Sequence, residues 1–516
     1  MLQVQNLSII QKKDYRVLVD NLSFVLNDGE KGALIGEEGN GKSTILKWIA
    51  DPASVEAYAE VKGTSRTKSR IGYLSQELSG EDQIRSIYSY MEDACALASL
   101  PPKKVIRTAK QLGLDADLLW EERTLASLSG GERIKVQLCA LLLNNCDLLL
   151  LDEPSNDLDL ETLLWLERFL QETDKSVLYV SHDEVLLERT AQLILHIEQV
   201  RRKSIPRAAA VRMSYRAYMD ERGRKMAHQA QVSAFEHDAF QKKKERYLAI
   251  YNAVDHAQSA ISRSDPSGGR LLKKKMHTVQ SLGRRLEKEQ EQLIELPEAE
   301  WAILPKFAEG IAIPNGKTVL DWNLPVLTAG EQTLAQNVRL HVAGPERICI
   351  IGRNGCGKST LVREIARELL PRKDLSVGYM PQQYDDLLGM ADTPITFLAP
   401  NADKETVTRA RRYLGSMKYT TDEMTHPMRE LSGGQRAKVL LLKLILDQNN
   451  VLILDEPTRN FSPLSNPAVR TLLHSFPGTI IAVSHDRKFL SEVATRVLEL
   501  TPEGLTERSL HALRQE

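Results

Sequence analysis

Residues 36–43 read Gly36-Glu37-Glu38-Gly39-Asn40-Gly41-Lys42-Ser43, after an apolar run at residues 33–35 and before a helix-like run. Glycines at this spacing let backbone N–H groups close around phosphate oxygens, and the lysine adds a positive charge. Residues 352–359 follow the same pattern, Gly352-Arg353-Asn354-Gly355-Cys356-Gly357-Lys358-Ser359, after an apolar run at 348–351. Each stretch predicts a strand, a phosphate-binding loop and a helix, the core of an α/β nucleotide-binding module.

Three further motifs occur twice in the chain, and the two copies are always 303 residues apart. They are Leu-Ser-Gly-Gly at 128–131 and 431–434, Asp-Glu-Pro at 152–154 and 455–457, and Ser-His-Asp at 181–183 and 484–486. A single phosphate loop can match by accident, but four ordered motifs that occur twice are not explained that way. The sequence therefore predicts two complete nucleotide-binding modules.

The composition is that of a folded protein. The chain has 516 residues and a formal net charge of −1, which is enough length for about three domains. Its five cysteines are odd in number, lack the spacing of a zinc site and indicate reduced thiols. The first residues do not resemble a signal peptide, and the most apolar run, 138–151, is interrupted by polar residues and too short to cross a bilayer. We therefore expect a cytoplasmic protein without a membrane segment, disulfide or zinc.

A basic segment separates the two modules. Residues 201–296 contain 21 Lys and Arg against 11 Asp and Glu, so the remainder of the chain is acidic. Residues 215–260 have no proline and one glycine, and residues 271–296 carry apolar side chains at helical spacing. Between them, Ser264-Asp265-Pro266-Ser267-Gly268-Gly269 is typical of a turn. The segment therefore predicts a long antiparallel helical hairpin.

These patterns divide the chain into three parts. We expect a first nucleotide-binding module at residues 1–203 and a second at 299–516. The helical hairpin linker would occupy 204–298, with its tip at about 261–272.

The predicted chemistry is binding of ATP with Mg²⁺, followed by hydrolysis. Lys42 and Lys358 should contact the β and γ oxygens. A hydroxyl at the start of the helix and a carboxylate at the end of a strand are ligand types that Mg²⁺ prefers. The predicted metal ligands are Ser43 and Asp152 in the first module and Ser359 and Asp455 in the second, with Gln76 and Gln382 as further metal and γ-phosphate sensors.

One carboxylate and one histidine in each module are candidates for catalysis. Glu153 and Glu456 directly follow the strand that ends in aspartate, where a carboxylate can polarise the attacking water. His182 and His485 come 29 residues later and can hold the γ-phosphate and that water. A lone histidine is more often structural, but the repeated Ser-His-Asp context favours a functional role. Tyr15 could stack on adenine or serve packing alone.

The candidate ATP-contacting residues belong to the phosphate loops, the two sensor glutamines and the Ser-Gly-Gly elements. In the first module they are Gly36, Glu37, Glu38, Gly39, Asn40, Gly41, Lys42, Ser43, Thr44, Gln76, Ser129, Gly130, Gly131 and Glu132. In the second they are Gly352, Arg353, Asn354, Gly355, Cys356, Gly357, Lys358, Ser359, Thr360, Gln382, Ser432, Gly433, Gly434 and Gln435.

The Leu-Ser-Gly-Gly elements distinguish this chain from most phosphate-loop ATPases and resemble the ATP-binding-cassette superfamily. Two such modules without membrane helices resemble its ABC-F branch, over essentially the whole chain. The resemblance implies an α/β fold with two P-loop ATP-binding-cassette domains, each a mixed sheet core plus a helical subdomain, joined by the helical hairpin. It also implies a monomer whose modules form a head-to-tail sandwich, each Ser-Gly-Gly closing on ATP held by the other module.

In that sandwich each site draws on both modules. One site would join Lys42, Gln76, Glu153 and His182 to Ser432, Gly433 and Gly434. The other would join Lys358, Gln382, Glu456 and His485 to Ser129, Gly130 and Gly131.

Resemblance to the ABC-F branch also implies action on the bacterial 70S ribosome. In that branch the linker tip approaches the peptidyl-transferase centre of the 23S rRNA and the tRNA in the P site. The basic charge of the hairpin suits RNA, since Lys and Arg gain affinity by releasing counterions from phosphates. A merely solvated helical spacer is the alternative, but the position between two cassettes, with Arg270 and Lys273-Lys274-Lys275 after the tip, favours RNA contact. No membrane or stable protein partner is expected.

Two details resemble the bacterial ribosome-protection proteins that confer resistance to lincosamides, streptogramin A and pleuromutilins. The first module has only 34 residues from Lys42 to Gln76. This is too few for the extra arm that housekeeping translation factors of the ABC-F branch carry in their first module. Residues 457–462 read Pro-Thr-Arg-Asn-Phe-Ser, which departs from the usual Pro-Thr-Asn-His-Leu-Asp and puts symmetric hydrolysis in doubt.

We therefore expect a factor that displaces a large-subunit antibiotic. Rescue of stalled ribosomes without any drug is the close alternative. Two further alternatives, an ATPase partner of a separate membrane transporter and a regulatory or DNA-repair ATPase, fit the fused basic hairpin less well.

Overall fold

The structure is a computed structural model that describes residues 1–76, 78–156, 158–200, 205–260, 266–292, 307, 310–330, 332–384, 387–401 and 403–509. The chain forms two compact units. One comprises Met1–Tyr215 with Glu300–Glu516, and the other comprises Arg216–Ala299. The first unit contains two α/β modules and the second contains a helical hairpin. Within the described ranges, every helix is too short or too polar to span a bilayer.

The first module, from β1 to β9, is built on a six-stranded sheet with the order β5-β6-β7-β3-β8-β9. Its strands are β3 (Lys31–Gly36), β5 (Ile71–Leu74), β6 (Leu148–Asp152), β7 (Ser176–Val180), β8 (Leu193–Val200) and β9 (Ile205–Arg212). Strands β5, β6, β7, β3 and β8 are parallel, and β9 pairs antiparallel with β8. The central strands are buried throughout and mostly apolar, because both faces of the sheet are covered.

The second module, from β10 to β17, repeats this sheet with the order β13-β14-β15-β12-β16-β17. Its strands are β12 (Arg347–Ile351), β13 (Val377–Met380), β14 (Val451–Asp455), β15 (Thr479–Val483), β16 (Arg496–Thr501) and β17 (Gly504–Arg508). The parallel and antiparallel pairings are the same as in the first module. The predicted pair of mixed α/β modules is therefore confirmed.

Smaller antiparallel sheets complete each module. In the first, β1 (Leu2–Gln11) lies between β2 (Val17–Leu26) and β4 (Ala59–Thr67). In the second, β10 (Thr318–Ala329) pairs with β11 (Gln332–Ala343). Alternate residues of β1, among them Leu2 and Val4, are buried against the helix that follows the first phosphate loop.

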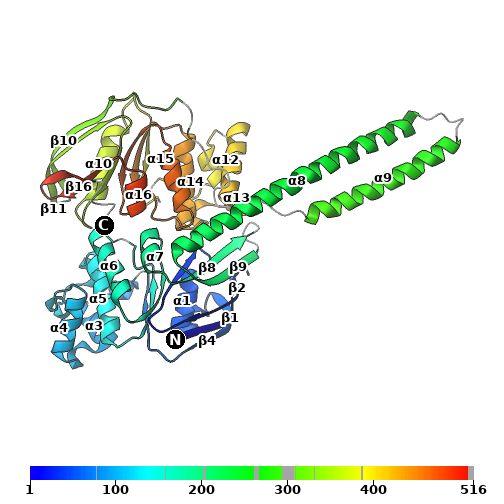
Figure 1. Ribbon diagram of the computed structural model, residues 1–516. Helices are drawn as coiled ribbons and strands as arrows, with labels where there is room; N and C mark the ends of the chain where they lie inside the picture. Colours follow the sequence, from blue (N-terminus) through cyan, green and yellow to red (C-terminus); the bar gives the residue numbers. More distant parts are fainter. Residues whose placement is uncertain are drawn as a thin grey trace. The chain divides into compact units, whose positions relative to one another are not determined.

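In each module a group of helices lies, along the sequence, between the strand that precedes the sensor glutamine and the strand that ends in aspartate. In the first module it contains α2 (Gly80–Ile84), α3 (Ile87–Cys95), α4 (Pro102–Gln111) and α5 (Gly130–Leu143). In the second it contains α11 (Pro394–Leu398), α12 (Lys404–Ser416), α13 (Thr421–Thr425) and α14 (Gly433–Leu446). Figure 1 shows α3, α4 and α5 of the first group and α12, α13 and α14 of the second. Both α5 and α14 begin inside the Ser-Gly-Gly element, so their N-termini carry this motif.

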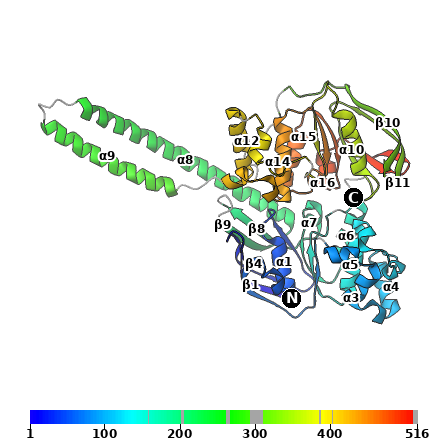
Figure 2. The same cartoon turned by 180° about the vertical axis from the view of Figure 1, so that it is seen from behind.

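The second unit consists of helices α8 (Tyr215–Ala260) and α9 (Pro266–Gln292), which run side by side in both ribbon views (Figures 1 and 2). Tyr215 itself, at the start of α8, belongs to the first unit. Lys243 on α8 forms an ion pair with Glu289 on α9. Gly283 lets α9 approach α8 closely, because a Cβ atom there would lie 2.6 Å from the Tyr247 hydroxyl oxygen.

Two details of the linker differ from the sequence prediction. Ser264–Gly269 was predicted as a turn, but α9 begins at Pro266, so the two glycines lie in its first turn. Proline suits the first helical position because its missing N–H would be unpaired there in any case. The tip residues 261–265 lie outside the described residues. Residues 205–212, predicted to open the linker, form β9 instead and belong to the first sheet.

Candidate nucleotide-binding sites

The two phosphate loops have the geometry that the sequence predicts. Each connects a central strand to a helix: β3 to α1 (Lys42–Ala50), and β12 to α10 (Lys358–Leu369). The residues before these helices are Gly41 and Gly357, with φ of 87° and 101°, a region that side chains other than glycine rarely occupy. Asn40 faces away from the loop interior, since its buried amide lies 3.3 Å from the Ile197 carbonyl oxygen.

The loop lysines curl back into their own loops. Lys42 Nζ donates hydrogen bonds to the carbonyl oxygens of Gly36 and Glu37 at 2.9 and 3.0 Å. Lys358 Nζ donates to those of Gly352 and Arg353, both at 2.8 Å. Burial lowers the pKa of both lysines, and the surrounding carboxylates oppose this shift. Both buried ammonium groups donate to backbone carbonyl oxygens, which are neutral, so a phosphate can supply the negative charge that a buried cation needs.

A hydroxyl and a carboxylate meet in each module, as predicted for a magnesium site. Ser43 Oγ donates to Asp152 Oδ1 at 3.0 Å, and the Tyr73 hydroxyl donates to Asp152 Oδ2 at 3.2 Å. In the second module, a hydrogen bond from Ser359 opposes the rise in the Asp455 pKa that burial causes. Asp455 Oδ1 is buried without a hydrogen-bond partner among the described residues. These oxygen donors fit Mg²⁺, which prefers carboxylate, hydroxyl and water oxygens.

The two candidate catalytic glutamates have the same unusual backbone conformation. Glu153 and Glu456 have φ of 51° and 53°, which costs energy for a residue with a side chain. Their N–H groups are fixed by hydrogen bonds to the carbonyl oxygens of Val180 (3.1 Å) and Val483 (2.9 Å) at the end of the adjacent strand. Both glutamates are therefore held at the carboxyl edge of the sheet, where ligands bind in open α/β folds.

In the first module, Glu153 is the centre of a hydrogen-bond network. His182 Nε2 lies 3.1 Å from Glu153 Oε1, Gln76 Nε2 donates to Oε2 at 3.0 Å, and Asn156 Nδ2 also donates to Oε2. Burial opposes ionisation, but His182, Lys42 and Asn156 lower the pKa of Glu153 to about 2. The structure thus brings together three residues predicted for this site and adds Asn156.

His182 also connects the two modules. Its Nδ1 lies 2.7 Å from the carbonyl oxygen of Phe461 in the second module. A carbonyl only accepts, so Nδ1 must carry a proton, and Nε2 carries a second one when it donates to Glu153. The Glu153 carboxylate raises the pKa of His182 against the effect of burial.

In the second module, the corresponding pair is not connected in this way. His485 Nε2 lies 3.8 Å from Glu456 Oε1, too far for a hydrogen bond. Both ring nitrogens of His485 are buried without a partner among the described residues. Burial, followed by the charge of Asp455, raises the pKa of Glu456 to about 8, while burial and Lys358 lower that of His485 to about 3. The pKa values of the glutamate and of the histidine are therefore shifted in opposite directions in the two sites.

The Ser-Gly-Gly elements cap the helices that they begin. Ser129 and Glu132 form a capping box at α5, and Ser432 and Gln435 form one at α14. In a capping box the serine hydroxyl and the following side chain each satisfy a backbone N–H of the first turn. Glu132 and Gln435, predicted as ATP contacts, thus hold the helix N-termini in shape.

Carboxylates of the first phosphate loop reach across to the second module. Glu38 Oε2 accepts a hydrogen bond from the Gly434 N–H at 2.6 Å. Glu37 Oε1 lies 2.6 Å from Lys418 Nζ, and both side chains are largely buried. The second loop has Arg353 and Asn354 at the corresponding positions. The Ser-Gly-Gly of the second module therefore faces the first phosphate loop, in the head-to-tail arrangement that the sequence suggests.

At the second phosphate loop, the carboxylate that reaches across the interface belongs to the other module and not to the loop itself. Asp159 Oδ2, in the segment after Glu153, accepts a hydrogen bond from the Asn354 N–H at 3.2 Å. The residue equivalent to Asp159 in the second module is Ser462, which has no carboxylate. At the first phosphate loop, the carboxylate that reaches across the interface is part of the loop itself. At the second phosphate loop, it comes from the segment after the catalytic glutamate of the first module.

A cavity of about 620 Å³ lies at the second phosphate loop. Its lining includes most residues predicted for that site, namely Gly130, Asn354, Gly355, Gly357, Lys358, Ser359, Thr360, Gln382, Asp455, Glu456 and His485. A second cavity, of about 410 Å³, lies between the first loop and the second Ser-Gly-Gly element, where Glu37, Glu38, Gly39, Ser432, Gly434 and Gln435 line it. Gly131 has a different environment, since a Cβ atom there would lie 2.7 Å from Thr162 Oγ1.

Several residues at these sites were not singled out from the sequence. Tyr73, Asn156, Lys418 and the Phe461 carbonyl contact predicted site residues. Tyr73 lies three residues before Gln76 and Asn156 three residues after Glu153, so both could have been found from these neighbours, whereas Lys418 has no motif around it. Tyr15 is 82% exposed, which argues against the alternative that it serves packing.

Comparison with known proteins identifies the family. The sequence profile of the ABC transporter family matches residues 19–156 and 335–459, which together are half of the chain. The chain belongs to the ABC transporter family. Its two modules are ATP-binding cassettes that hydrolyse ATP with Mg²⁺.

Relatives of this ABC protein match it over most of its length. The chain is 28% identical to the probable ATP-binding protein YheS of Escherichia coli K12, over 93% of this chain and 76% of that protein. It is also 28% identical to the putative ATP-binding protein YdiF of Bacillus subtilis (98% and 81%) and to the energy-dependent translational throttle protein EttA of E. coli K12 (95% and 91%). All three matches cover most of both chains.

Solved structures support the fold of this ABC protein. The archaeal ribosome recycling factor aABCE1, solved with the ribosomal stalk protein aP1, superposes with a TM-score of 0.59 at 19% identity, covering 96% of this chain and 87% of that chain. The RNase-L Inhibitor gives the same TM-score and identity, over 97% and 90%. At this identity the likeness concerns the fold alone.

Proposed function

We propose that this chain is an ABC-F ATPase that binds the bacterial 70S ribosome in its ATP state and inserts its hairpin toward the peptidyl-transferase centre. The observation that carries this proposal is the second compact unit, a basic two-helix hairpin encoded between two complete cassettes. The match to EttA, whose name describes an energy-dependent translational throttle, supports it. Such a factor would work in the cytoplasm.

In this proposal ATP and Mg²⁺ join the two modules. Lys42 and Lys358 would hold the phosphates, and Mg²⁺ would bind at Ser43 with Asp152 and at Ser359 with Asp455. Bound Mg²⁺ neutralises phosphate charge during transfer. Gln76 and Gln382 would sense metal and γ-phosphate. Glu153 and Glu456 would polarise the attacking water, and His182 and His485 would position it.

We assign Glu38 a role in timing the closure of the first site. Its carboxylate accepts the Gly434 N–H at the N-terminus of α14, where the partial positive charge of a helix attracts anions. The γ-phosphate would take this position in a closed sandwich. Nucleotide would therefore displace one anion with another, and loss of the γ-phosphate after hydrolysis would let Glu38 return.

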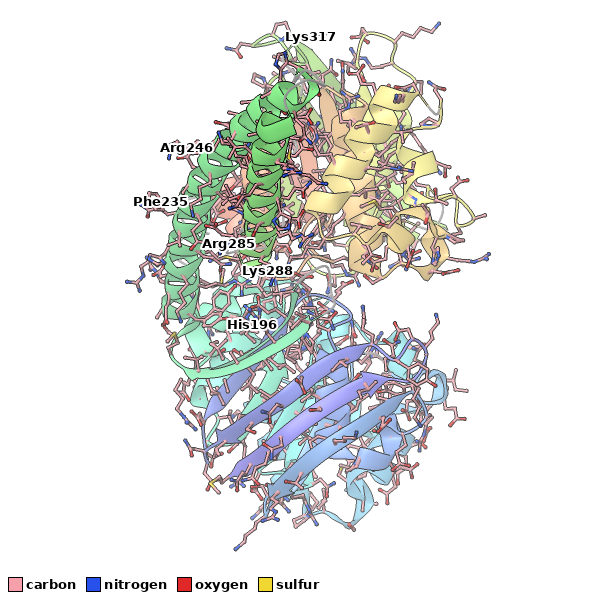
Figure 3. All side chains as sticks on the ribbon, turned by 90° about the vertical axis from the view of Figure 1, so that its right-hand side faces the viewer. His196, Phe235, Arg246, Arg285, Lys288 and Lys317 are labelled. Atoms are coloured by element: carbon pink, nitrogen blue, oxygen red, sulfur yellow. The ribbon has the colours of Figure 1, made fainter. Side chains whose placement is uncertain are left out.

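The hairpin would contact RNA through exposed basic side chains. Lys273, Lys274 and Lys275 are all exposed on α9, while Met276 and Val279 on the same helix are buried. Figure 3 labels Arg246 on α8 and Arg285 and Lys288 on α9, further basic residues of the hairpin. Phe235, 77% exposed, projects from α8 in the same view and offers an aromatic surface for stacking. The 23S rRNA and the P-site tRNA would be the partners.

The finer proposal is protection of the ribosome from lincosamides, streptogramin A or pleuromutilins. It rests on the short first cassette and on the segment after Glu456. Between α1 and β5 the structure describes only the short helix Pro52–Val55 and β4, leaving no room for an extra arm. Drug displacement would follow from a shift of tRNA and rRNA by the hairpin.

A translation factor that relieves stalled ribosomes without a drug is the second candidate. The match to EttA favours it, because EttA is named as a translational throttle protein. Both candidates share the ATP sites and the ribosome, and they differ only in the effect of the hairpin.

The minimum inhibitory concentration in a susceptible bacterium distinguishes the two candidates. Expression of the chain should raise tolerance to at least one of the three large-subunit drug classes and to no drug that acts on the small subunit or the cell wall. The matched control is the Glu153→Gln/Glu456→Gln variant. If tolerance is unchanged while ribosome binding is retained, the chain is the stalled-ribosome factor. Tolerance that spans unrelated drug classes would instead indicate transport.

A further inference from the structure

Buried ion pairs connect the two cassettes outside the nucleotide sites. Glu184, at the start of α7 (Glu184–Thr190), forms a two-point contact with Arg470 on α15 (Asn466–His474). The distances are 2.6 Å from Arg470 Nη1 to Glu184 Oε1 and 3.2 Å from Nη2 to Oε2. The side chains are 5% and 3% exposed. Desolvation of this kind is costly unless both charges are matched.

A second buried pair lies close by. Arg487, at the start of α16 (Arg487–Glu492), contacts Glu167 on α6 (Leu160–Glu172) at 2.6 Å, and both side chains are 6% exposed. Arg487 also contacts Asp183 at 3.2 Å. Helices α7 and α16 meet at this interface, where both views place them next to each other (Figures 1 and 2).

The internal repeat relates these two pairs to each other. Glu167 and Arg470 are 303 residues apart, as are Glu184 and Arg487, which is the offset of the duplicated motifs. The pairs are therefore equivalent contacts on the two sides of one pseudo-symmetric interface. The symmetry is broken only in charge, because both acids are on the first cassette and both bases are on the second.

The surrounding side chains follow the same division. Lys488 of the second cassette contacts Glu184 at 3.1 Å and Glu188 at 2.6 Å, both on the first. The first cassette therefore presents an acidic face, made of Glu167, Glu184 and Glu188, in which Glu167 also contacts Arg189 of the same cassette at 2.7 Å. The second presents a basic face, made of Arg470, Arg487 and Lys488, in which Arg470 also contacts Glu492 of the same cassette at 2.7 Å.

The duplicated motifs alone do not make this distinction. Each cassette carries a full phosphate loop, a Ser-Gly-Gly element and a catalytic glutamate, so two first cassettes from different molecules have all the parts of a sandwich. In such a like-with-like pair, however, the equivalent positions would bury glutamate against glutamate, or arginine against arginine. Buried like charges are strongly unfavourable.

We infer that the acidic and basic faces are a recognition surface that selects pairing of a first cassette with a second cassette and rejects pairing of like cassettes. The occupant of the acidic face is the second cassette of this chain. The charges determine which cassette docks and in which position, while ATP controls the closing of the two cassettes. This inference does not depend on the ribosome proposal, and its test contains no ribosome.

The test uses full-length variants that differ in pairing but not in net charge. Glu184→Arg/Arg470→Glu exchanges the charges within one pair, whereas Glu184→Arg/Arg487→Glu places like charges in both pairs. Each variant has two substitutions and an unchanged total charge. We expect the mispaired variant to lose at least tenfold in ATPase rate and to unfold at lower temperature. The exchanged variant should stay within about threefold of the wild type, and light scattering should show it as a monomer.

Equal losses in the two variants would overturn the inference. If charge reversal prevents folding, the neutral substitutions Glu184→Gln and Arg470→Gln provide a second test. The inference predicts coupling, so the double variant should lose clearly less thermal stability and ATPase than the sum of the single losses. Additive losses would mean that the pair does not act as a unit and would refute it.

Discussion

The Glu38 carboxylate accepts a hydrogen bond of 2.6 Å from the Gly434 N–H, so an acid of the first phosphate loop caps a helix of the second cassette. At the other site the loop residue is Asn354, whose N–H donates to Asp159 at 3.2 Å. The carboxylate therefore lies on the phosphate loop at the first site and opposite the phosphate loop at the second. This exchange explains how each site keeps a carboxylate that reaches across the interface although Ser462 replaces the expected aspartate.

Replacing Glu38 with Asn, the residue of the second loop, should strengthen ATP binding at the first site. The carboxylate no longer competes with the γ-phosphate for the Gly434 N–H, and a charge-assisted hydrogen bond is worth about 1.5–3 kcal/mol. We expect a KM for ATP lower by on the order of tenfold. The converse variant, Asn354→Glu, should raise the KM. An unchanged or higher KM for Glu38→Asn would contradict competition.

The second glycines of the two Ser-Gly-Gly elements should differ in their tolerance of alanine. A Cβ atom at Gly434 would lie 2.4 Å from the backbone oxygen of Asn460, which cannot rotate away. At Gly131 the nearest atom belongs to the mobile side chain of Thr162. Gly434→Ala should therefore destabilise the protein by roughly 1–3 kcal/mol, visible as a lower thermal midpoint. Gly131→Ala should cost clearly less, and the reverse order would argue against this packing.

The two histidines should not be equivalent. His182 connects Glu153 to the Phe461 carbonyl across the interface, whereas both ring nitrogens of His485 lack a partner among the described residues. His182→Ala should lower kcat for ATP by on the order of a hundredfold and also lower the thermal midpoint. His485→Ala should have a smaller effect on both. Equal effects would mean that the two sites work alike.

The exposed lysines of α9 should contribute to ribosome affinity through charge. Replacing Lys273, Lys274 and Lys275 with Ala should weaken binding and flatten the plot of log affinity against log salt, by about 0.7–0.9 per lost phosphate contact. The control variant replaces all three with Arg and should keep both affinity and slope. ATPase activity without ribosomes should be unchanged. An unaltered salt slope would reduce these lysines to a solvated face.

The tip of the hairpin should set the drug spectrum. Exchanging Ser264–Gly269 for the tip of a relative should change which large-subunit drugs are tolerated, because only a few side chains reach the drug-proximal RNA. Turnover of ATP should remain the same, since the cassettes are intact. Minimum inhibitory concentrations across the three drug classes, with ATPase rates as the control, measure this. If the same drugs are tolerated after the exchange, the tip does not determine the drug spectrum.

The order of elements and the main site residues could be predicted because they are local in sequence. The phosphate loops, Asp152 and Asp455, and the hairpin arms follow from short patterns. The predicted turn at 264–269 was wrong over residues 266–269, because proline followed by small residues is compatible with both a turn and a helix start, and no local signal decides between them.

The contacts between cassettes could not be predicted in the same way. Glu38 with Gly434, and Lys418 with Glu37, depend on how two modules dock, which no spacing encodes. The Glu184–Arg470 and Glu167–Arg487 pairs did leave a signal, since a comparison at the 303-residue offset shows opposite charges at both positions. The different surroundings of Glu153 and Glu456 also follow from docking, because the Phe461 carbonyl oxygen of the second cassette accepts a hydrogen bond from His182 of the first.

Sedimentation with 70S ribosomes tests the central claim most directly. In the Glu153→Gln/Glu456→Gln variant the side chains keep their shape but lose the charge that polarises water, so ATP should persist and the cassettes should stay closed. We predict that with ATP this variant pellets with ribosomes in near-stoichiometric amount and with ADP stays in the supernatant, while the wild type is released as it hydrolyses ATP. Equal recovery of the variant with ATP and ADP, or normal ATP turnover by it, would contradict the account.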